Sequence, residues 1–347
     1  MNDLPDYLED DEPEFNRKKI IINGIVISVV LIIFFIFFLY FAVTMPGESI
    51  EREMPQLTNE LSDLSQRLQA HVYHLSEEIG DRSTGQNIKL DQAADYIHQQ
   101  LESFGYIPTS RVFGRDNLRN IEVDLYGQEK RDEVLIIGAH YDTRWLTPGA
   151  DDNASGVAGL LEIARHLSDK RFPRTIRFIA FANEEVPRYR QNEMGSMYSA
   201  KRSYTRSELI AGMISLEMIG YYSDEPGSQR YPDILQKFYP DTGNFIAFVS
   251  NLSSRDFQMR AITYFRDLEI FPSEGLVAPQ WIERDIRRSD HASYWYYDFP
   301  AIMITDTSFY RNRNYHSPED RFDTLDYESM AKVVKGLALM LERLAQE

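Results

Sequence analysis

The most strongly hydrophobic part of the chain lies near its start, where residues 20–43 carry no charged side chain. A helix of these 24 residues is about 36 Å long, enough to cross the hydrocarbon core of a bilayer. Arg17, Lys18 and Lys19 precede the segment, and acidic residues follow it. The positive-inside rule then places the N-terminus in the cytoplasm and the remaining chain on the outer side, which is periplasmic or extracellular.

Two other structures for residues 20–43 are a buried core helix and a cleaved signal peptide. A core helix of this length would carry more polar residues. A signal peptide has a shorter apolar run, followed by a small-x-small cleavage site that is absent here. We therefore predict one transmembrane helix in the lipid bilayer, a cytoplasmic acidic tail at residues 1–19 and a short stalk at residues 44–56.

Beyond the stalk, apolar residues recur at intervals of three and four from Leu57 to Ile79. This spacing indicates a long amphipathic helix. Its apolar stripe could also form a dimerising coiled coil, but we favour the first helix of a globular domain that spans residues 57–347. The pattern leaves the oligomeric state open.

The rest of the chain combines short, continuous apolar runs with segments of helical spacing. The apolar runs are typical of strands buried on both faces, and they occupy residues 134–139, 175–181, 213–216 and 301–304. Helical spacing occurs at residues 91–104, 156–167 and 329–344. Such alternation predicts an α/β fold, a three-layer sandwich with a mostly parallel central sheet. Ligands of such sheets gather at the carboxyl ends of the strands.

Charge and composition narrow the possible functions. The formal net charge of −17 argues against nucleic acid as a partner, because a surface this acidic repels phosphates. The chain contains no cysteine, so disulfides and thiolate ligands are both excluded. Any metal site must therefore be built from histidine and carboxylate side chains.

Histidine and acidic residues follow the predicted strands at the points where the strands end. They are His140, Asp142, Asp151, Asp152, Glu184, Glu185, Glu217 and His316. Each alone has an ordinary explanation, since an aspartate before a helix is usually an N-cap. Together, however, these carboxylates would repel one another at one sheet edge unless cations neutralised them. Mixed histidine and carboxylate ligation suits Zn²⁺, and Co²⁺ or Mn²⁺ as well.

The number of these residues fits a site with two metal ions, an arrangement that proteins use for hydrolysis. One carboxylate would bridge the ions, and each ion would take one histidine and one further carboxylate. One glutamate then remains to act as a base. Spacing alone does not choose between Asp151 and Asp152 as the bridge.

Six motifs in residues 57–347 are similar to those of the zinc aminopeptidase family that includes bacterial leucyl aminopeptidases and glutamate carboxypeptidase. They are Ala139-His140-Tyr141-Asp142, residues 149–156, Asn183-Glu184-Glu185, residues 216–220, Ser289-Asp290-His291 and residues 315–320. This resemblance implies that residues 57–347 form a zinc-peptidase catalytic domain holding two Zn²⁺. We assign Ser289-Asp290-His291 to the surroundings of the site rather than to a serine triad, because contiguous residues do not adopt that geometry.

The resemblance also implies a role for each candidate residue. His140 binds one ion, Asp152 bridges both ions, and Glu185 and His316 bind the other ion. Glu217 stands where many members carry aspartate, and it completes the ligands of the His140 ion. Glu184 corresponds to the general base that takes a proton from the attacking water. Asp142 corresponds to the carboxylate that orients His140, as expected behind a metal-binding histidine.

The sequence departs from the family at residues 186–194, where the loop is longer than in the commonest pattern. Arg188 and Arg190 in this loop could meet a substrate carboxylate, but we favour solvated loop charges. Residues 221–285 hold an irregular, aromatic stretch that we expect to cover the site.

The resemblance implies a membrane-anchored metallopeptidase with a peptide substrate, and an aminopeptidase that removes N-terminal residues is the leading hypothesis. Carboxypeptidase or dipeptidase specificity stays open. A glutaminyl cyclase-like acyltransferase with a single zinc ion is the alternative enzyme, and metal stoichiometry would separate the two. A receptor-like member without activity is disfavoured, because no ligand or base is missing.

Overall fold

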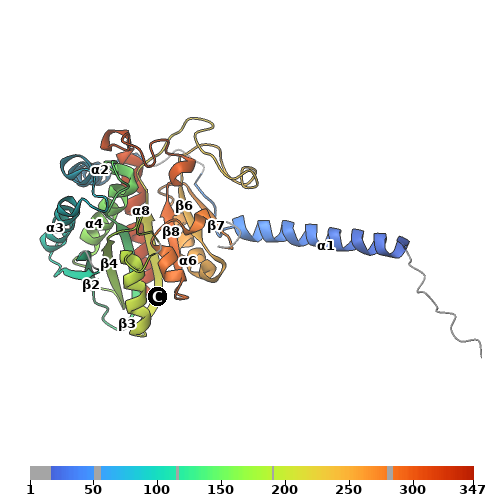
Figure 1. Ribbon diagram of the computed structural model, residues 1–347, viewed down its shortest axis with the longest axis horizontal. Coiled ribbons are helices and arrows are strands. Elements are labelled where there is room, and N and C mark those ends of the chain that lie inside the picture. Colours follow the sequence, from blue (N-terminus) through green and yellow to red (C-terminus); the bar gives the residue numbers. More distant parts are fainter. Residues whose placement is uncertain (1–16, 51–55, 115–116, 190, 280–283) are drawn as a thin grey trace, which may run out of the picture. The chain divides into compact units, whose positions relative to one another are not determined.

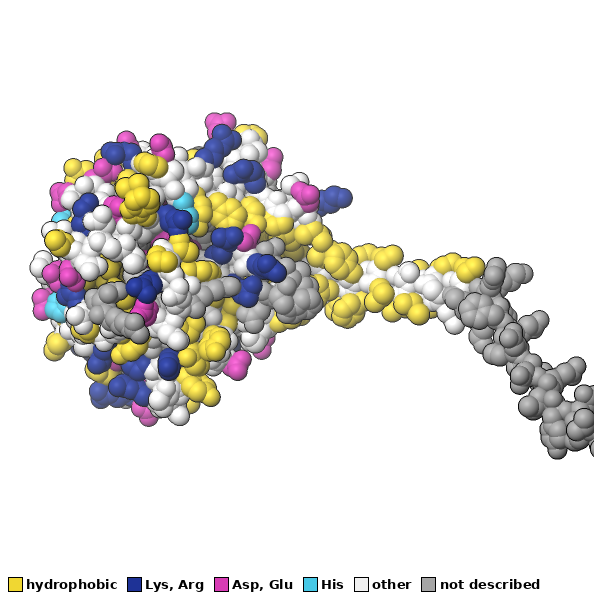
Figure 2. Space-filling view, in the orientation of Figure 1, with side chains coloured by type: hydrophobic (Ala, Val, Ile, Leu, Met, Phe, Trp, Pro, Cys, Tyr) yellow, Lys and Arg dark blue, Asp and Glu magenta, His cyan; other side chains and the backbone are white. Residues whose placement is uncertain are grey.

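The computed structural model describes residues 17–50, 56–114, 117–189, 191–279 and 284–347. The chain divides into two compact units, Met1–Ala42 and Val43–Glu347. Helix α1 (Arg17–Val43) dominates the first. Its residues Ile21–Val43 are long and apolar enough to cross a membrane, and Figure 2 shows hydrophobic side chains along them. Residues 1–16 of the predicted acidic tail lie outside the described part of the chain.

The second unit is built on an eight-stranded mixed sheet in the order β1-β2-β4-β3-β5-β8-β6-β7 (Figure 1). The central strands β4, β3, β5 and β8 are parallel, whereas β1, β2 and β6 each have an antiparallel neighbour. The strands are β1 (Thr109–Phe113), β2 (Leu118–Leu125), β3 (Lys130–His140), β4 (Arg174–Phe181), β5 (Leu209–Glu217), β6 (Ile246–Ser250), β7 (Ser273–Val277) and β8 (Ala301–Thr305).

Helices cover both faces of the sheet, which makes three layers. On one face lie α2 (Asn59–Tyr73), α3 (Asn87–Ser103), α4 (Gly156–Leu167), α6 (Arg255–Arg266) and α8 (Tyr327–Gln346). The other face is covered by α5 (Gly195–Thr205) and α7 (His291–Trp295). The predicted α/β fold is thereby confirmed.

Strand β3 shows why the central strands read as continuous apolar runs. Leu135 and Ile137 belong to the core on one face of the sheet, and Val134 and Ile136 to the core on the other. Successive side chains of a strand point to opposite faces, so a strand covered on both sides buries every residue. Each such large side chain contributes roughly 1.5–3 kcal/mol by burial.

The long amphipathic segment divides into two parts. Helix α2 begins after Thr58, whose side chain accepts a hydrogen bond from the nitrogen of Leu61, and a π-helical turn follows at His74–Ile79. The apolar stripe of α2 is buried in the domain core, where the helix packs against α4 and α8. The stripe is thus occupied inside the domain, which leaves no such face for a coiled coil.

One segment differs from the sequence expectation. Residues 221–245 are irregular, but 246–277 form β6, α6 and β7, so the prediction of an irregular stretch to residue 285 was wrong there. In the predicted stalk, the carbonyls of Pro46 and Gly47 accept hydrogen bonds from Arg266 at 3.1 and 2.9 Å. Residues 51–55 of that segment lie outside the described residues.

Candidate metal centre

The candidate residues meet at the carboxyl edge of the central parallel strands. His140 is the last residue of β3, and Glu217 is the last residue of β5. Glu184 and Glu185 follow β4, which ends at Phe181. Because parallel strands end at the same edge of a sheet, these side chains are brought together from distant parts of the sequence.

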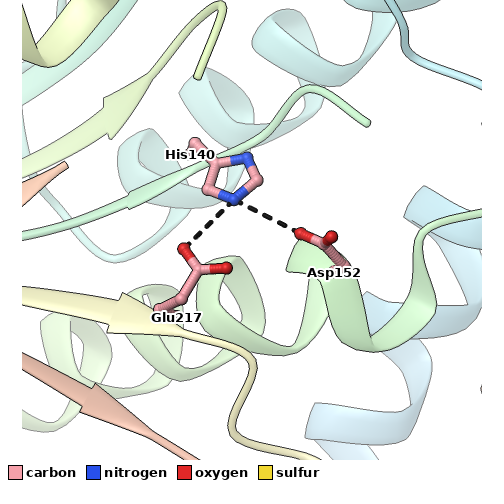
Figure 3. A group of neighbouring side chains, drawn as sticks. All are labelled: His140, Asp152 and Glu217. Carbon is pink, nitrogen blue, oxygen red and sulfur yellow. Dashed lines mark ion pairs between the residues drawn. The ribbon is translucent and has the colours of Figure 1, made fainter. Parts of the chain in front are cut away.

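One group of three side chains surrounds His140 (Figure 3). The Nε2 atom of His140 lies 3.4 Å from Oδ1 of Asp152 and 3.3 Å from Oε2 of Glu217. All three residues are buried. Within the described residues, His140 Nε2 and Asp152 Oδ1 have no partner in hydrogen-bonding geometry. Buried polar atoms of this kind are usually satisfied, so two of them side by side fit a site for a cation.

A second group shares Asp152 with the first. The Nε2 atom of His316 lies 3.1 Å from Oδ2 of Asp152 and 3.0 Å from Oε1 of Glu185. The two oxygens of Asp152 therefore face two different histidines. Each histidine also faces one glutamate, which gives two groups that could each hold an ion.

The buried carboxyl groups of the site favour the binding of positive charge. Burial raises the pKa of Glu184 well above its ordinary value, and the charges of Glu217 and Glu185 add to this effect. Burial and the neighbouring Asp152 raise the pKa of Glu185 to about 7. Carboxyl groups in such surroundings ionise readily only beside cations. Imidazole nitrogens and carboxylate oxygens are ligands of Zn²⁺, so these residues fit a zinc site.

Asp142 connects the loops that carry His140 and the two glutamates. His140 Nδ1 lies 3.2 Å from the carbonyl oxygen of Asp142 and 3.4 Å from its Oδ1 atom. The same carboxylate accepts hydrogen bonds from the backbone nitrogens of Glu184, at 2.9 Å, and Glu185, at 3.0 Å. Asp142 is therefore in a position to orient both His140 and Glu184.

Residues with left-handed backbone conformations turn the chain beside the site. Asn183, Met218 and His316 have φ angles of 60°, 50° and 57°. Such conformations cost roughly 1–3 kcal/mol for residues other than glycine and persist only where surrounding contacts enforce them. Asn183 lies between the end of β4 and Glu184, and Met218 directly follows Glu217 at the end of β5.

Several site residues could not be assigned from spacing. Asp151 faces away from the histidines, and its oxygens accept hydrogen bonds from the nitrogen of Gly220 at 3.0 Å and Nδ2 of Asn312 at 2.7 Å. Asp320 accepts hydrogen bonds from the backbone nitrogens of Asp151 and Asp152 at 2.8 and 3.1 Å. These contacts hold the turn that presents Asp152.

The Ser289-Asp290-His291 motif lies beside the site. The hydroxyl of Ser289 donates a hydrogen bond to Oε2 of Glu217 at 2.6 Å. His291 Nε2 lies 2.6 Å from the carbonyl oxygen of Ile286. The motif thus supports a candidate ligand through Ser289.

A largely apolar pocket of about 120 Å³ lies beside Glu217. Its walls include the aromatic side chains of Tyr231, Tyr239, Phe245, Phe309, Tyr310 and Tyr315. Three of these residues, Tyr231, Tyr239 and Phe245, come from the aromatic stretch that was expected to cover the site. In the longer loop, Arg188 pairs with Glu193, and Tyr189 donates a hydrogen bond to the carbonyl of Arg287. Arg190 and Trp281 lie outside the described residues.

Comparison with known proteins gives the family of the chain. Residues 120–341 match Peptidase family M28. The chain belongs to this family. The uncharacterized protein YfbL of Escherichia coli (strain K12) is 40% identical over 292 residues, which cover 80% of this chain and 87% of YfbL. A probable zinc metalloprotease of Pyrenophora tritici-repentis is 33% identical over 192 residues, 50% of this chain and 43% of the fungal protein. The chain thus spans less than half of that relative.

Solved structures with the same fold include members of two enzyme classes. The LapA aminopeptidase of Legionella pneumophila aligns with a TM-score of 0.65 and 21% identity, over 86% of this chain and 78% of LapA. The glutaminyl cyclase of Porphyromonas gingivalis aligns with a TM-score of 0.61 and 20% identity, over 81% and 99% of the respective chains. At these identities the likeness shows the fold alone. Family membership makes the chain a zinc-type metallopeptidase, as the motifs predicted.

Proposed function

We propose that the protein is a membrane-anchored aminopeptidase that uses two zinc ions. The observation that carries the proposal is the position of Asp152, whose two oxygens face His140 and His316 separately. His140, Asp152 and Glu217 would hold one ion, and His316, Glu185 and Asp152 the other. A single-zinc cyclase would need only one of these groups.

Glu184 would carry the proton chemistry, and Asp142 would position it. When bound, the zinc ions would polarise the scissile carbonyl and acidify the attacking water. Glu184 would accept the proton of that water and donate it to the leaving amine. Its burial suits this work, because a general base functions best with a pKa near the working pH. Asp142 would hold Glu184 in place through the backbone bond described above.

The apolar pocket supports a preference for bulky hydrophobic side chains. Glu217 and Tyr315 lie on its wall, so a side chain in the pocket would start beside the reacting carbonyl. Aromatic and aliphatic walls gain most from burying a large apolar group. Arg188 and Arg288, which could otherwise attract a C-terminal carboxylate, pair with Glu193 and Asp285. An amino-terminal leucine or phenylalanine is therefore the proposed substrate residue.

A panel of substrates on zinc-loaded full-length protein in detergent tests the proposal. Leucine and phenylalanine p-nitroanilides should be cleaved, their N-acetyl forms should not, and zinc analysis should give two ions per chain. Cleavage of the blocked forms alone would contradict an aminopeptidase. One zinc ion together with cyclisation of N-terminal glutamine would favour the cyclase instead.

Helix α1 supports a single-pass anchor with the N-terminus in the cytoplasm and the catalytic domain on the outer side. The absence of cysteine makes this simple to test, because one introduced cysteine is a unique label. Ser253→Cys, at an exposed position of the domain, should react with a membrane-impermeant maleimide on intact cells, and Leu8→Cys should react only after lysis. The reverse result would invert the topology. Release of a chain that lacks residues 1–43 would identify a signal peptide.

A further inference from the structure

Arg82 is a fully buried arginine close to the candidate metal centre. Within the described residues, its guanidinium donates hydrogen bonds to backbone carbonyls only. The acceptors are the carbonyl oxygens of Tyr141 at 2.8 Å, Leu75 at 2.7 Å, Gly80 at 3.0 Å, Pro148 at 2.8 Å and Gly149 at 2.9 Å. A buried arginine whose donors are this fully used has a fixed position, because the planar guanidinium presents its donors in a rigid array.

Three of these carbonyls, those of Tyr141, Pro148 and Gly149, lie at the two ends of the loop between His140 and Asp152. Tyr141 directly follows His140, and Gly149 lies three residues before Asp152. Gly149 has a φ angle of 63°, and a side chain there would lie 2.3 Å from Cγ2 of Thr143 and 2.5 Å from the carbonyl oxygen of Asp152. The loop is therefore tightly folded around the guanidinium, which sets the separation of its two ends.

Residues next to Arg82 extend these contacts, and we refer to residues 81–84 as the clamp segment. The nitrogen of Arg82 donates a hydrogen bond to Oγ1 of Thr143 at 3.0 Å, and Asp81 accepts one from the nitrogen of Leu146 at 3.1 Å. Thr84 donates a hydrogen bond to Oδ1 of Asn183 at 3.3 Å. The clamp segment thus touches both the loop after β3 and the turn that leads to Glu184.

Arg82 also brings a buried positive charge to an acidic site. Burial lowers the pKa of Arg82 to about 10, and the carboxylates of Asp142, Asp320 and Asp152 oppose this shift. The guanidinium is therefore charged at neutral pH. It partly offsets the charges of Asp142, Asp320 and Asp152.

We infer that Arg82 is a positioning residue, which sets the distance between His140 and Asp152 so that both can serve the metal centre. This inference rests on the proposed function. Arg82 lies outside residues 120–341, the part that matches the peptidase family. The amino-terminal segment of the domain therefore contacts the loop that carries the candidate ligands.

Two variants and a matched control test the inference on the full-length protein in detergent. Arg82→Lys keeps the charge but cannot hold five carbonyls, and Thr84→Val removes only the bond to Asn183. Arg177→Lys is the control. Arg177 lies on β4, and it is another buried arginine, which pairs with Asp124 and Glu208. The measurements are zinc affinity by chelator competition, kcat and KM on leucine p-nitroanilide, and the melting temperature of the metal-free protein.

Arg82→Lys should weaken zinc binding at least tenfold and lower kcat at least tenfold, with KM changed less than threefold. Thr84→Val should lower kcat severalfold. Arg177→Lys should lower only the melting temperature. The inference is wrong if Arg82→Lys binds zinc like the wild type, or if Arg177→Lys weakens zinc binding equally. If Arg82→Lys does not fold, an unchanged kcat and zinc affinity in Thr84→Val would refute it.

The zinc measurement also separates this inference from the proposed function. A wild-type protein that binds zinc but cleaves no peptide would refute the peptidase proposal. The effect of Arg82 on zinc affinity would still be measurable in that case.

Discussion

Asp142 accepts a hydrogen bond from the backbone nitrogen of Glu184 at 2.9 Å, although 42 positions separate the two residues. The same carboxylate lies beside Nδ1 of His140. One side chain therefore fixes both a candidate ligand and the candidate base. Neither could shift alone without breaking a buried contact.

Asp142→Asn should therefore damage activity more than stability. The amide NH₂ group cannot accept the hydrogen bond of Glu184 or Glu185, so one buried N–H loses its partner. We expect kcat to fall roughly 10–100-fold, the usual effect of losing a residue that orients a metal ligand. Steady-state kinetics on zinc-loaded protein measure this effect. Asp124→Asn, far from the metal centre on β2, is the control and should leave kcat unchanged.

Glu184→Gln should remove the base and spare the ligands. The amide cannot take a proton from water, so we expect kcat to fall by roughly 10²–10⁴-fold or more. Zinc content should stay at the wild-type value, because Glu184 belongs to neither group of candidate ligands. Kinetics and metal analysis of the same preparation measure both. A variant that keeps its activity would show that the base is another residue.

Glu217→Ala should change the number of bound ions. Glu217 belongs to the His140 group and is absent from the His316 group. Zinc analysis after dialysis should therefore give one ion per chain where the wild type holds two. Glu133→Gln, at the opposite end of the sheet and paired with Arg174, is the control for loss of an acidic residue. Two ions in Glu217→Ala would remove this residue from the ligands.

Ala247→Phe should alter the choice of substrate. Ala247 lies on the pocket wall. A phenyl ring at this position would occupy the space that we propose for a substrate side chain. We expect kcat/KM for phenylalanine p-nitroanilide to fall roughly tenfold or more, while that for alanine p-nitroanilide stays within about threefold. An equal loss for both substrates would mean that the pocket does not hold the substrate side chain.

Glu162 should shape the acid stability of the domain. Burial raises its pKa, but hydrogen bonds with His71, Arg165 and Arg67 outweigh burial and lower the pKa to about 2. A pKa below the unfolded value means stability that is present above about pH 4.5 and lost as the pH falls toward 2. The contribution is roughly 2–3 kcal/mol.

Urea unfolding at several pH values measures the effect of Glu162. Glu162→Gln should lower the free energy of unfolding at pH 7 and flatten its pH dependence between pH 4.5 and 2. Parallel curves for the variant and the wild type would assign the acid sensitivity to other groups.

The central strands could be predicted from the sequence because both of their faces are buried. Strand β7, with Ser273, Glu274 and Gly275, has no apolar run, since a strand at the edge of the sheet needs none. Strand β2 is not purely apolar, because it contains the buried residue Glu122, which pairs with Arg202. Strand β6 is fully buried and apolar up to its final serine, so the same rule applied there would have found it.

The candidate site was likewise predictable only in part. Motif order brought His140, Asp152 and Glu217 into one prediction because each ends or follows a strand of the parallel sheet. Arg82 had no such signal, since an arginine between Asp81 and Ser83 resembles a solvated loop residue. Its burial depends on a loop about sixty positions away, and no local pattern encodes that contact.

The two histidines differ in their access to solvent. The side chain of His316 is 29% exposed, whereas that of His140 is 0% exposed. An ion held by His316 would therefore lie closer to bulk water than one held by His140, which is enclosed by its neighbours. Loading and emptying of the centre would follow an order in time, and a chelator would reach the His316 side first.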